Sequence, residues 1–346
     1  MSRGKKILSF YDDEDFGGGG RAPRKPPDRF KVTLTTHSGG DVGVHRLGVN
    51  ALAYSDQEGV LYSGGRDGCI RQWDVQGAGA PGRCRQLFQG HNDWVTGVVS
   101  TADGRNMVSC SHDTSLKVWH ANSFQPGNGE EGAIKLCRPI CSMVHHTDYV
   151  KGIAYSPASG QVASVGLDGN LFVWDLGGGG NSTFPSFSVT EEIDDGHKNS
   201  IYAVAISADG NMVVTGGTEE TVRVWDLRQR GGARRKRNNS STAAVELEGH
   251  KGTIRCVSFV EGNGNLCLSG GSDCTLNAWD IRMGTSLFSA KCHDDSLWAM
   301  AVDGRGQSVF TGSRGGGLPA PTLGPGTANS SAPRTLRSSP SCTGAR

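Results

Sequence analysis

The chain has 346 residues, of which 36% are hydrophobic and 20% are charged, so it is long enough to bury the core of a large domain. Its 35 basic and 34 acidic residues nearly cancel, which removes any general attraction to nucleic acid or to an anionic membrane surface. No apolar run approaches the roughly 20 residues that span a bilayer, and the first residues lack a secretory core, so we expect an intracellular protein without membrane insertion.

The N-terminal residues 1–28 contain the acidic run YDDED and the basic, proline-rich run RAPRKPP. This composition predicts a disordered tail. Residues 29–36, RFKVTLTT, alternate apolar and polar side chains, and we interpret them as a strand.

From residue 45 onward, one spacing pattern recurs five times and ends each time in Trp. A His precedes each Trp by 28 residues in the first four repeats and by 29 in the fifth, and an apolar residue four positions after each His opens a strand-like alternation. A hydroxyl side chain stands ten residues before each Trp, and an acid stands six before it. These positions are His45, Ser63, Asp67 and Trp73; His91, Ser109, Asp113 and Trp119; His146, Ser164, Asp168 and Trp174; His197, Thr215, Glu219 and Trp225; and His250, Ser269, Asp273 and Trp279.

A hydroxyl, a His and an acid also make up a hydrolytic triad, but a triad occurs once in an active site, whereas this set occurs five times in company with an indole donor. The spacings match the WD-repeat pattern, and the chain resembles a WD40 β-propeller, an all-β fold in which each repeat forms a four-stranded antiparallel blade. The resemblance implies that Trp, hydroxyl, His and acid form a structural hydrogen-bond relay within each blade. We therefore expect no catalytic residue and no enzyme.

Two departures from the pattern carry predictions of their own. Glu219 stands where the other repeats have Asp, so we expect the fourth blade to be the looser one. A sixth repeat begins with His293, Leu297 and Thr311, but Gly315 takes the place of its acid.

Residues 315–346 contain no acid and no aromatic residue, and half of them are Gly, Pro or Ser. We therefore expect a disordered C-terminal tail, with either an alternative exon or a changed reading frame as its origin. The expected fold is an incomplete propeller over residues 29–314, with five full blades, half of a sixth and a candidate closing strand at 29–36.

Positions just after the opening apolar residue and just before the acid are expected to face one rim of a propeller. Arg, Tyr and Trp are the residue types that concentrate binding energy at protein interfaces. The partner-binding candidates at these positions are Lys151, Tyr202, Arg255, Trp298 and Arg314.

Several segments, among them HNDWV, HTDYVKGIAYS, GGTEETVRVWDLR and LWAM followed by TGSR, resemble a family of WD-repeat proteins that activate ubiquitin-specific proteases. The resemblance implies a non-catalytic subunit of the nucleus and cytoplasm that binds these deubiquitinating enzymes, raises their activity and so meets ubiquitinated substrates. It also implies that Arg255, Trp298 and Arg314 contact the protease. The alternative is a generic assembly scaffold or substrate-receptor adaptor with a different peptide partner.

No cofactor, metal or small-molecule substrate is expected. Of the ten Cys residues only Cys137 and Cys141 are close in sequence, and no second pair accompanies them as a zinc site requires. Cys110, Cys256 and Cys267 lie in apolar strand-like runs and are expected to be reduced.

Overall fold

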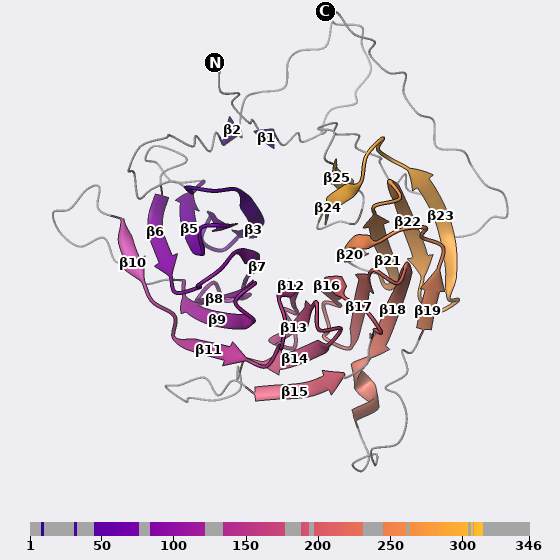
Figure 1. The fold of residues 1–346 in the computed structure, drawn as a ribbon, viewed down its shortest axis with the longest axis horizontal. Coiled ribbons are helices and arrows are strands. Elements are labelled where there is room, and N and C mark those ends of the chain that lie inside the picture. Colours follow the sequence, from indigo (N-terminus) through magenta and orange to yellow (C-terminus); the bar gives the residue numbers. More distant parts are fainter. Residues whose placement is uncertain are drawn as a thin grey trace, which may run out of the picture.

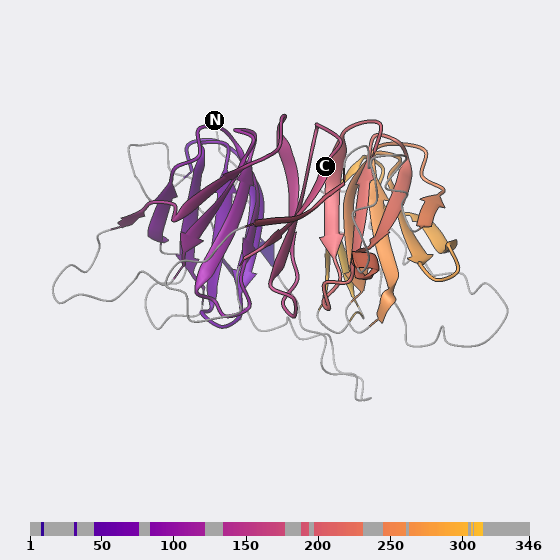
Figure 2. The ribbon, with the colours of Figure 1, turned by 90° about the horizontal axis from the view of Figure 1, so that it is seen from below.

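Antiparallel sheets arranged around a central axis form an open ring in the computed structural model (Figure 1). Figure 2 shows the strands running between the two rims of this ring. The structure describes residues 8–9, 31–32, 45–75, 84–121, 134–176, 188–193, 197–230, 245–260, 263–303, 306 and 308–313.

The expected all-β propeller with five complete blades and half of a sixth is confirmed. Each complete blade runs from an inner strand at the axis to an outer strand at the circumference, and the sixth sheet holds an inner and a second strand. The inner strands are β3 (Val49–Ser55), β7 (Val95–Ser100), β12 (Val150–Tyr155), β16 (Ile201–Ile206), β20 (Ile254–Val260) and β24 (Leu297–Val302). The second strands are β4 (Val60–Gly65), β8 (Asn106–Ser111), β13 (Gln161–Gly166), β17 (Met212–Gly217), β21 (Asn263–Gly271) and β25 (Val309–Ser313). The third strands are β5 (Cys69–Asp74), β9 (Ser115–His120), β14 (Leu171–Asp175), β18 (Thr221–Asp226) and β22 (Thr275–Asp280). The outer strands are β6 (Cys84–Gln89), β11 (Cys141–Val144), β15 (Ser188–Ile193), β19 (Val245–Glu248) and β23 (Thr285–Lys291).

The core lies between neighbouring blades, because each sheet from the second to the fifth has a neighbour on either side. The second strands are therefore buried on both faces, and in β17 the side chains of Val213, Val214 and Thr215 are all 0% exposed. Ala163 and Val173 of the third blade pack in one cluster with Val213 and Trp225 of the fourth. A blade is thus stabilised mainly by apolar burial against its neighbours.

Within the described ranges, three short strands lie outside this repeat. β10 (Lys135–Cys137) pairs in parallel with β6 as a fifth strand of the first sheet, and Cys137 donates its thiol to Gln86 Oε1 at 3.1 Å. β1 (Leu8–Ser9) pairs with β2 (Lys31–Val32) in an antiparallel sheet of their own.

The predicted tails fall mostly outside the described residues. β1 falls in the range 1–28, for which a disordered tail is expected, and β2 falls in the candidate closing strand, but among the described residues neither pairs with a blade. The rest of residues 1–36 and all of 314–346 lie outside the described residues. A short 3-10 helix, η1 (Leu227–Arg230), follows the fourth Trp strand, and no helix among the described residues is long and apolar enough to cross a bilayer.

The turn between the second and third strands requires a positive φ just after the acid. Gly68 and Gly169 satisfy this requirement with φ of 71° and 76°. Thr114, Glu220 and Cys274 adopt the same conformation with φ of 66°, 63° and 65°, although a side chain disfavours it.

Replacing Cys274 by Gly should therefore raise the free energy of unfolding by about 1 kcal/mol, because it relieves the left-handed backbone strain. Urea denaturation measures the change. The matched control is Gly169→Ala, which should lower stability, since a Cβ there would lie 2.9 Å from the His197 carbonyl oxygen. A Cys274→Gly chain no more stable than the original would contradict the strain argument.

Candidate functional site

A chain of three hydrogen bonds crosses four of the five complete blades from the third strand to the loop before the inner strand. In the second blade, Trp119 Nε1 donates to Ser109 Oγ at 2.8 Å, and Ser109 Oγ lies 2.8 Å from His91 Nε2. His91 Nδ1 lies 2.8 Å from Asp113 Oδ2. A neutral His that accepts at Nε2 and donates at Nδ1 satisfies every group of this relay.

The first, third and fifth blades contain the same three contacts. The Trp-to-hydroxyl, hydroxyl-to-His and His-to-acid distances are 2.7, 2.7 and 2.9 Å for Trp73, Ser63, His45 and Asp67; 2.9, 2.9 and 2.8 Å for Trp174, Ser164, His146 and Asp168; and 2.7, 2.7 and 2.8 Å for Trp279, Ser269, His250 and Asp273. The four Ser side chains of these relays, Ser109 included, are 0% exposed, so each would cost about 1–3 kcal/mol if it lost its partners.

The acid also fastens the His loop to the turn that follows the second strand. Asp113 accepts the backbone N–H of Asn92, next to His91, at 3.0 Å and the N–H of Ser115 at 3.1 Å. Burial by itself would raise the pKa of Asp113, but the hydrogen bonds that it accepts from His91, Ser115 and Asn92 hold that pKa well below its usual range. The relay therefore fixes the position of one rim relative to the blade interior.

The fourth blade departs from this geometry as its Glu suggests. Trp225 and His197 bond to Thr215 Oγ1 at 2.9 and 2.8 Å, but His197 Nδ1 lies 3.4 Å from Glu219 Oε2 and makes no hydrogen bond. The longer side chain extends past its target, and its other oxygen accepts the N–H of Asn199, one residue further along than in the other blades.

The sixth sheet retains the inner part of the relay. His293 Nε2 lies 2.8 Å from Thr311 Oγ1, the distance found in complete blades. No carboxylate pairs with His293 among the residues that the structure describes.

Each inner strand has a β-bulge at its second residue. In all six sheets the register between inner and second strand shifts after the opening apolar residue, so one residue has no partner across the sheet. A bulge redirects the side chain of its extra residue, and bulges are frequent beside functional sites. These bulge residues are Asn50, Thr96, Lys151, Tyr202, Arg255 and Trp298.

Four of the bulge residues are predicted partner-binding candidates, and the structure brings them together. The Arg255 guanidinium lies between two rings, 4.8 Å from the centroid of Tyr202 and 4.5 Å from that of Trp298. Lys151 Nζ lies 5.9 Å from Tyr202 on the other side. The fifth candidate, Arg314, lies outside the described residues.

Further residues extend this group over the first three blades. Lys151 Nζ donates to His112 Nε2 at 2.7 Å, and His112 stacks on Tyr149 with centroids 4.5 Å apart. His112 also stacks on Trp94 at 5.3 Å, and Arg66 lies 4.5 Å from the Trp94 centroid. We call the continuous set the cation–aromatic arc: Arg66, Trp94, His112, Tyr149, Lys151, Tyr202, Arg255 and Trp298.

Trp94 and Tyr149 were missed at the sequence level. Each stands directly before the opening apolar residue of its inner strand, and its carbonyl accepts the N–H of the residue before an acid, as Trp94 does for His112 at 3.0 Å. Trp94, Tyr149 and Trp298 are 38%, 43% and 52% exposed. An aromatic residue three positions after the repeat His is the signal that could have identified the first two.

Electrostatics keep His112 neutral within the arc. Burial lowers its pKa, the neighbouring Lys151 ammonium lowers it further, and Asp93 and Asp148 oppose these effects. Burial and, to a smaller extent, the positive charge of Arg255 likewise lower the pKa of Lys151. A neutral His112 can accept a hydrogen bond from the Lys151 ammonium group. The positive charge of the arc therefore lies on Arg66, Lys151 and Arg255.

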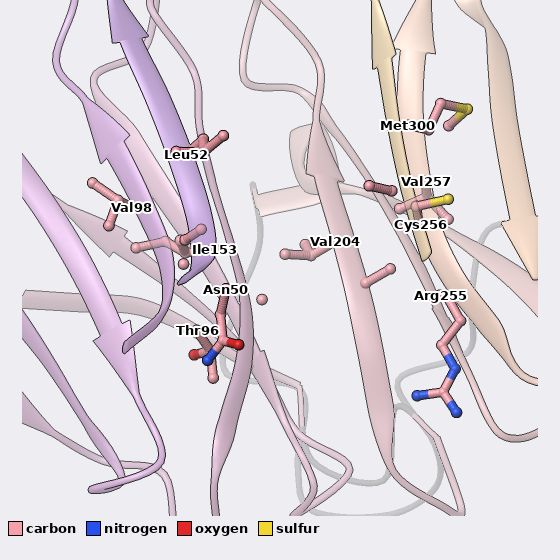
Figure 3. A pocket seen from close by; sticks show the side chains of 15 residues that line it. Asn50, Leu52, Thr96, Val98, Ile153, Val204, Arg255, Cys256, Val257 and Met300 are labelled. Atoms are coloured by element: carbon pink, nitrogen blue, oxygen red, sulfur yellow. The ribbon is translucent and has the colours of Figure 1, made fainter. Parts of the chain in front are cut away.

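A cavity of about 310 Å³ lies at the axis, lined by all six inner strands. Figure 3 shows Ile153, Val204 and Val257 around it, with Asn50 and Thr96 on one wall and Arg255 on another. Over the described part of the chain, no three His, Cys, Asp or Glu side chains form a group suited to a metal ion. Burial raises the pKa of Cys110 and Cys267 to about 12, which leaves these thiols protonated.

The family model described as WD domain, G-beta repeat matches five segments that cover more than half of the chain. They are residues 31–74, 82–120, 137–175, 189–226 and 241–280. Each match contains the second and third strands of one complete blade, with the hydroxyl, acid and Trp of its relay.

Replacing Glu219 by Asp should raise the free energy of unfolding by about 1 kcal/mol, because the shorter carboxylate can accept the His197 Nδ1 hydrogen that now has no partner. Thermal and urea denaturation measure the gain. Asp273→Glu is the matched control and should cost a similar amount by creating the same defect in the fifth blade. Two variants with unchanged midpoints would show that the acid contributes nothing to blade stability.

The pKa of His197 leads us to expect that the free energy of unfolding depends on pH. Burial, followed by the Arg223 charge, lowers its pKa from 6.5 to about 4 in the folded chain, against the opposing charge of Glu219. The unfolded chain therefore binds this proton at higher pH, so this contribution to stability is complete above pH 6.5 and is lost as the pH falls towards 4.

Urea unfolding of the original chain and of Glu219→Asp at pH 7 and pH 5 tests this dependence. The original should lose more stability between the two values, because an Asp bonded to His197 favours the charged ring. Equal losses would show that His197 does not set the acid sensitivity.

Proposed function

We propose that this chain, which belongs to the WD40-repeat family, binds a partner protein through the cation–aromatic arc. We propose further that this partner is a ubiquitin-specific protease. WD40-repeat proteins are generally non-catalytic interaction scaffolds, and WD40 domains mediate protein–protein contacts. The arc supports a protein partner because it joins exposed aromatic rings and cations over six neighbouring sheets.

The single observation that carries the proposal is the environment of Arg255. Its guanidinium is held between Tyr202 and Trp298, which reduces the side-chain entropy that binding would cost. Its Nε is buried and has no hydrogen-bond partner among the described residues. A carbonyl or carboxylate oxygen of a partner would bind the half-buried guanidinium group, and Trp298, 52% exposed, would lose its water contact at the same time.

The choice of a ubiquitin-specific protease rests on the resemblance of the repeat segments to activators of these enzymes. Arg255 and Trp298 stand where those activators place a basic and an aromatic contact residue. The bound subunit would raise the activity of the protease and promote deubiquitination in the nucleus and cytoplasm. A generic scaffold with another peptide partner remains the second candidate, since the arc would serve any acidic, partly apolar surface.

The first test is a titration of each variant against a ubiquitin-specific protease. Trp298→Ala should weaken binding most, by about 2 kcal/mol or roughly 30-fold, because a buried aromatic residue at an interface carries that much. Arg255→Glu should act partly through the association rate, so its effect should shrink as salt is added. Arg228→Glu is the matched control, because Arg228 lies just after the C-terminal end of β18, away from the bulge residues that form the arc.

Turnover of a fluorogenic ubiquitin substrate separates the two candidate functions. The chain should increase turnover only when the protease is present, and Trp298→Ala should abolish the increase while melting like the original. If all variants fold and bind like the original, the partner surface lies elsewhere. Binding through the arc without any increase in turnover would favour the generic scaffold.

A further inference from the structure

The free edge of β25 is the part of the ring where the repeat stops between two strands. In every complete blade a third strand pairs with the second strand, as β22 does with β21 from Leu266↔Asp280 to Gly270↔Leu276. Among the described residues, β25 pairs only with β24. An unpaired edge presents a row of backbone donors and acceptors to any extended segment.

The five complete blades show what such a segment must contain. Thr311 and His293 already hold the 2.8 Å contact that occurs inside the complete relays, and both side chains are largely buried at 2% and 7% exposure. In the fifth blade the third strand adds Trp279, which donates to the hydroxyl, and Asp273, which accepts from the His. The same two groups would complete the relay of the sixth sheet.

Packing places β25 in the position of a second strand. Val309 packs against the fifth blade and is 1% exposed. Cys267, which stands at the same position relative to the hydroxyl residue of the fifth blade, is 0% exposed. Phe310 is 42% exposed, whereas its counterpart Leu268 is 0% exposed because it packs in one cluster with Leu297 and Val309 of the next sheet. In register, Leu268 lies opposite Ala278, so a third strand would place the residue just before its Trp opposite Phe310.

The sequence after β25 lacks the acid and the Trp that a third strand contributes to the relay. Residues 315–346 contain neither Trp nor an acid, and the five strands that do carry both are paired within their own blades. A second copy of the chain could supply such a strand only by opening one of its blades.

We propose that β25 accepts, from a partner protein, an extended segment with an acid, apolar residues three and five positions later, and Trp six positions later. The segment pairs antiparallel with β25, its Trp Nε1 donates to Thr311 Oγ1, and its acid accepts from His293 Nδ1. This edge differs from the cation–aromatic arc in its mode of binding, because it would recognise the segment through backbone pairing and the relay.

A synthetic peptide with the sequence of residues 168–176, DGNLFVWDL, is the probe, and fluorescence anisotropy with a dye on the peptide measures its binding to the full chain. Trp174→Phe in the peptide should weaken binding about fivefold, the effect of one hydrogen bond. Asp168→Ala in the peptide should weaken it to a similar degree. Hydrogen exchange should show new protection of residues 309–313 when the original peptide is bound.

The Thr311→Val chain provides a second, independent test, because it removes the hydroxyl while retaining the shape of the side chain. The original and Trp174→Phe peptides should bind this variant equally well. The proposal is overturned if the original chain does not bind the peptide, binds both Trp and Phe forms alike, or shows no protection at 309–313. It is also overturned if light scattering shows a dimer in which these residues are protected without peptide, since a second copy would then be the occupant.

Discussion

The hydrogen bond from a buried Trp indole to a buried hydroxyl is the interaction on which the rest of each blade depends. The indole belongs to the third strand and the hydroxyl to the second, so the bond fixes their relative position at the blade interior, as for Trp119 and Ser109. The hydroxyl then orients the repeat His, and the His orients the acid. Through the acid, the loop before the inner strand is joined to the turn at the rim.

This connection explains why the functional candidates lie where they do. The relay fixes the loop and turn on either side of the inner strand's first residue, and the bulge follows directly. The bulge residue stands at the same place in all six sheets, including the sixth, which retains the His-to-hydroxyl contact, and its identity changes from Asn50 to Trp298. A repeated and nearly constant interior thus supports a rim whose chemistry can vary, which is the general logic of repeat proteins that bind partners.

Much of the fold could be predicted because a relay requires particular residue types at particular separations. His, hydroxyl, acid and Trp must all be present for the buried groups to be satisfied, so their spacing revealed the strands and the incomplete sixth sheet. The effect of Glu219 could also be foreseen, because one extra methylene changes which backbone N–H the carboxylate reaches. The parallel pairing of β10 could not be foreseen, because the connection that contains it repeats no pattern.

The site was only partly accessible from sequence for a different physical reason. Arg255 and Trp298 could be placed on one rim by their repeat positions, but the stacking of Trp94, His112 and Tyr149 joins residues of different blades. Nothing in a local sequence shows that an aromatic residue points along the rim rather than into the core. Only the bulge register and the placement of neighbouring blades make these rings continuous with Lys151.

The most direct test of the central claim is hydrogen exchange of the full chain with and without a ubiquitin-specific protease, read by mass spectrometry at the bulge residues. The account predicts that the protease adds protection at the bulges of β12, β16, β20 and β24 and in the turns beside them, while the opposite ends of the same strands exchange as before. Protection confined to the outer strands or to the opposite rim, with the bulges unchanged, would contradict it.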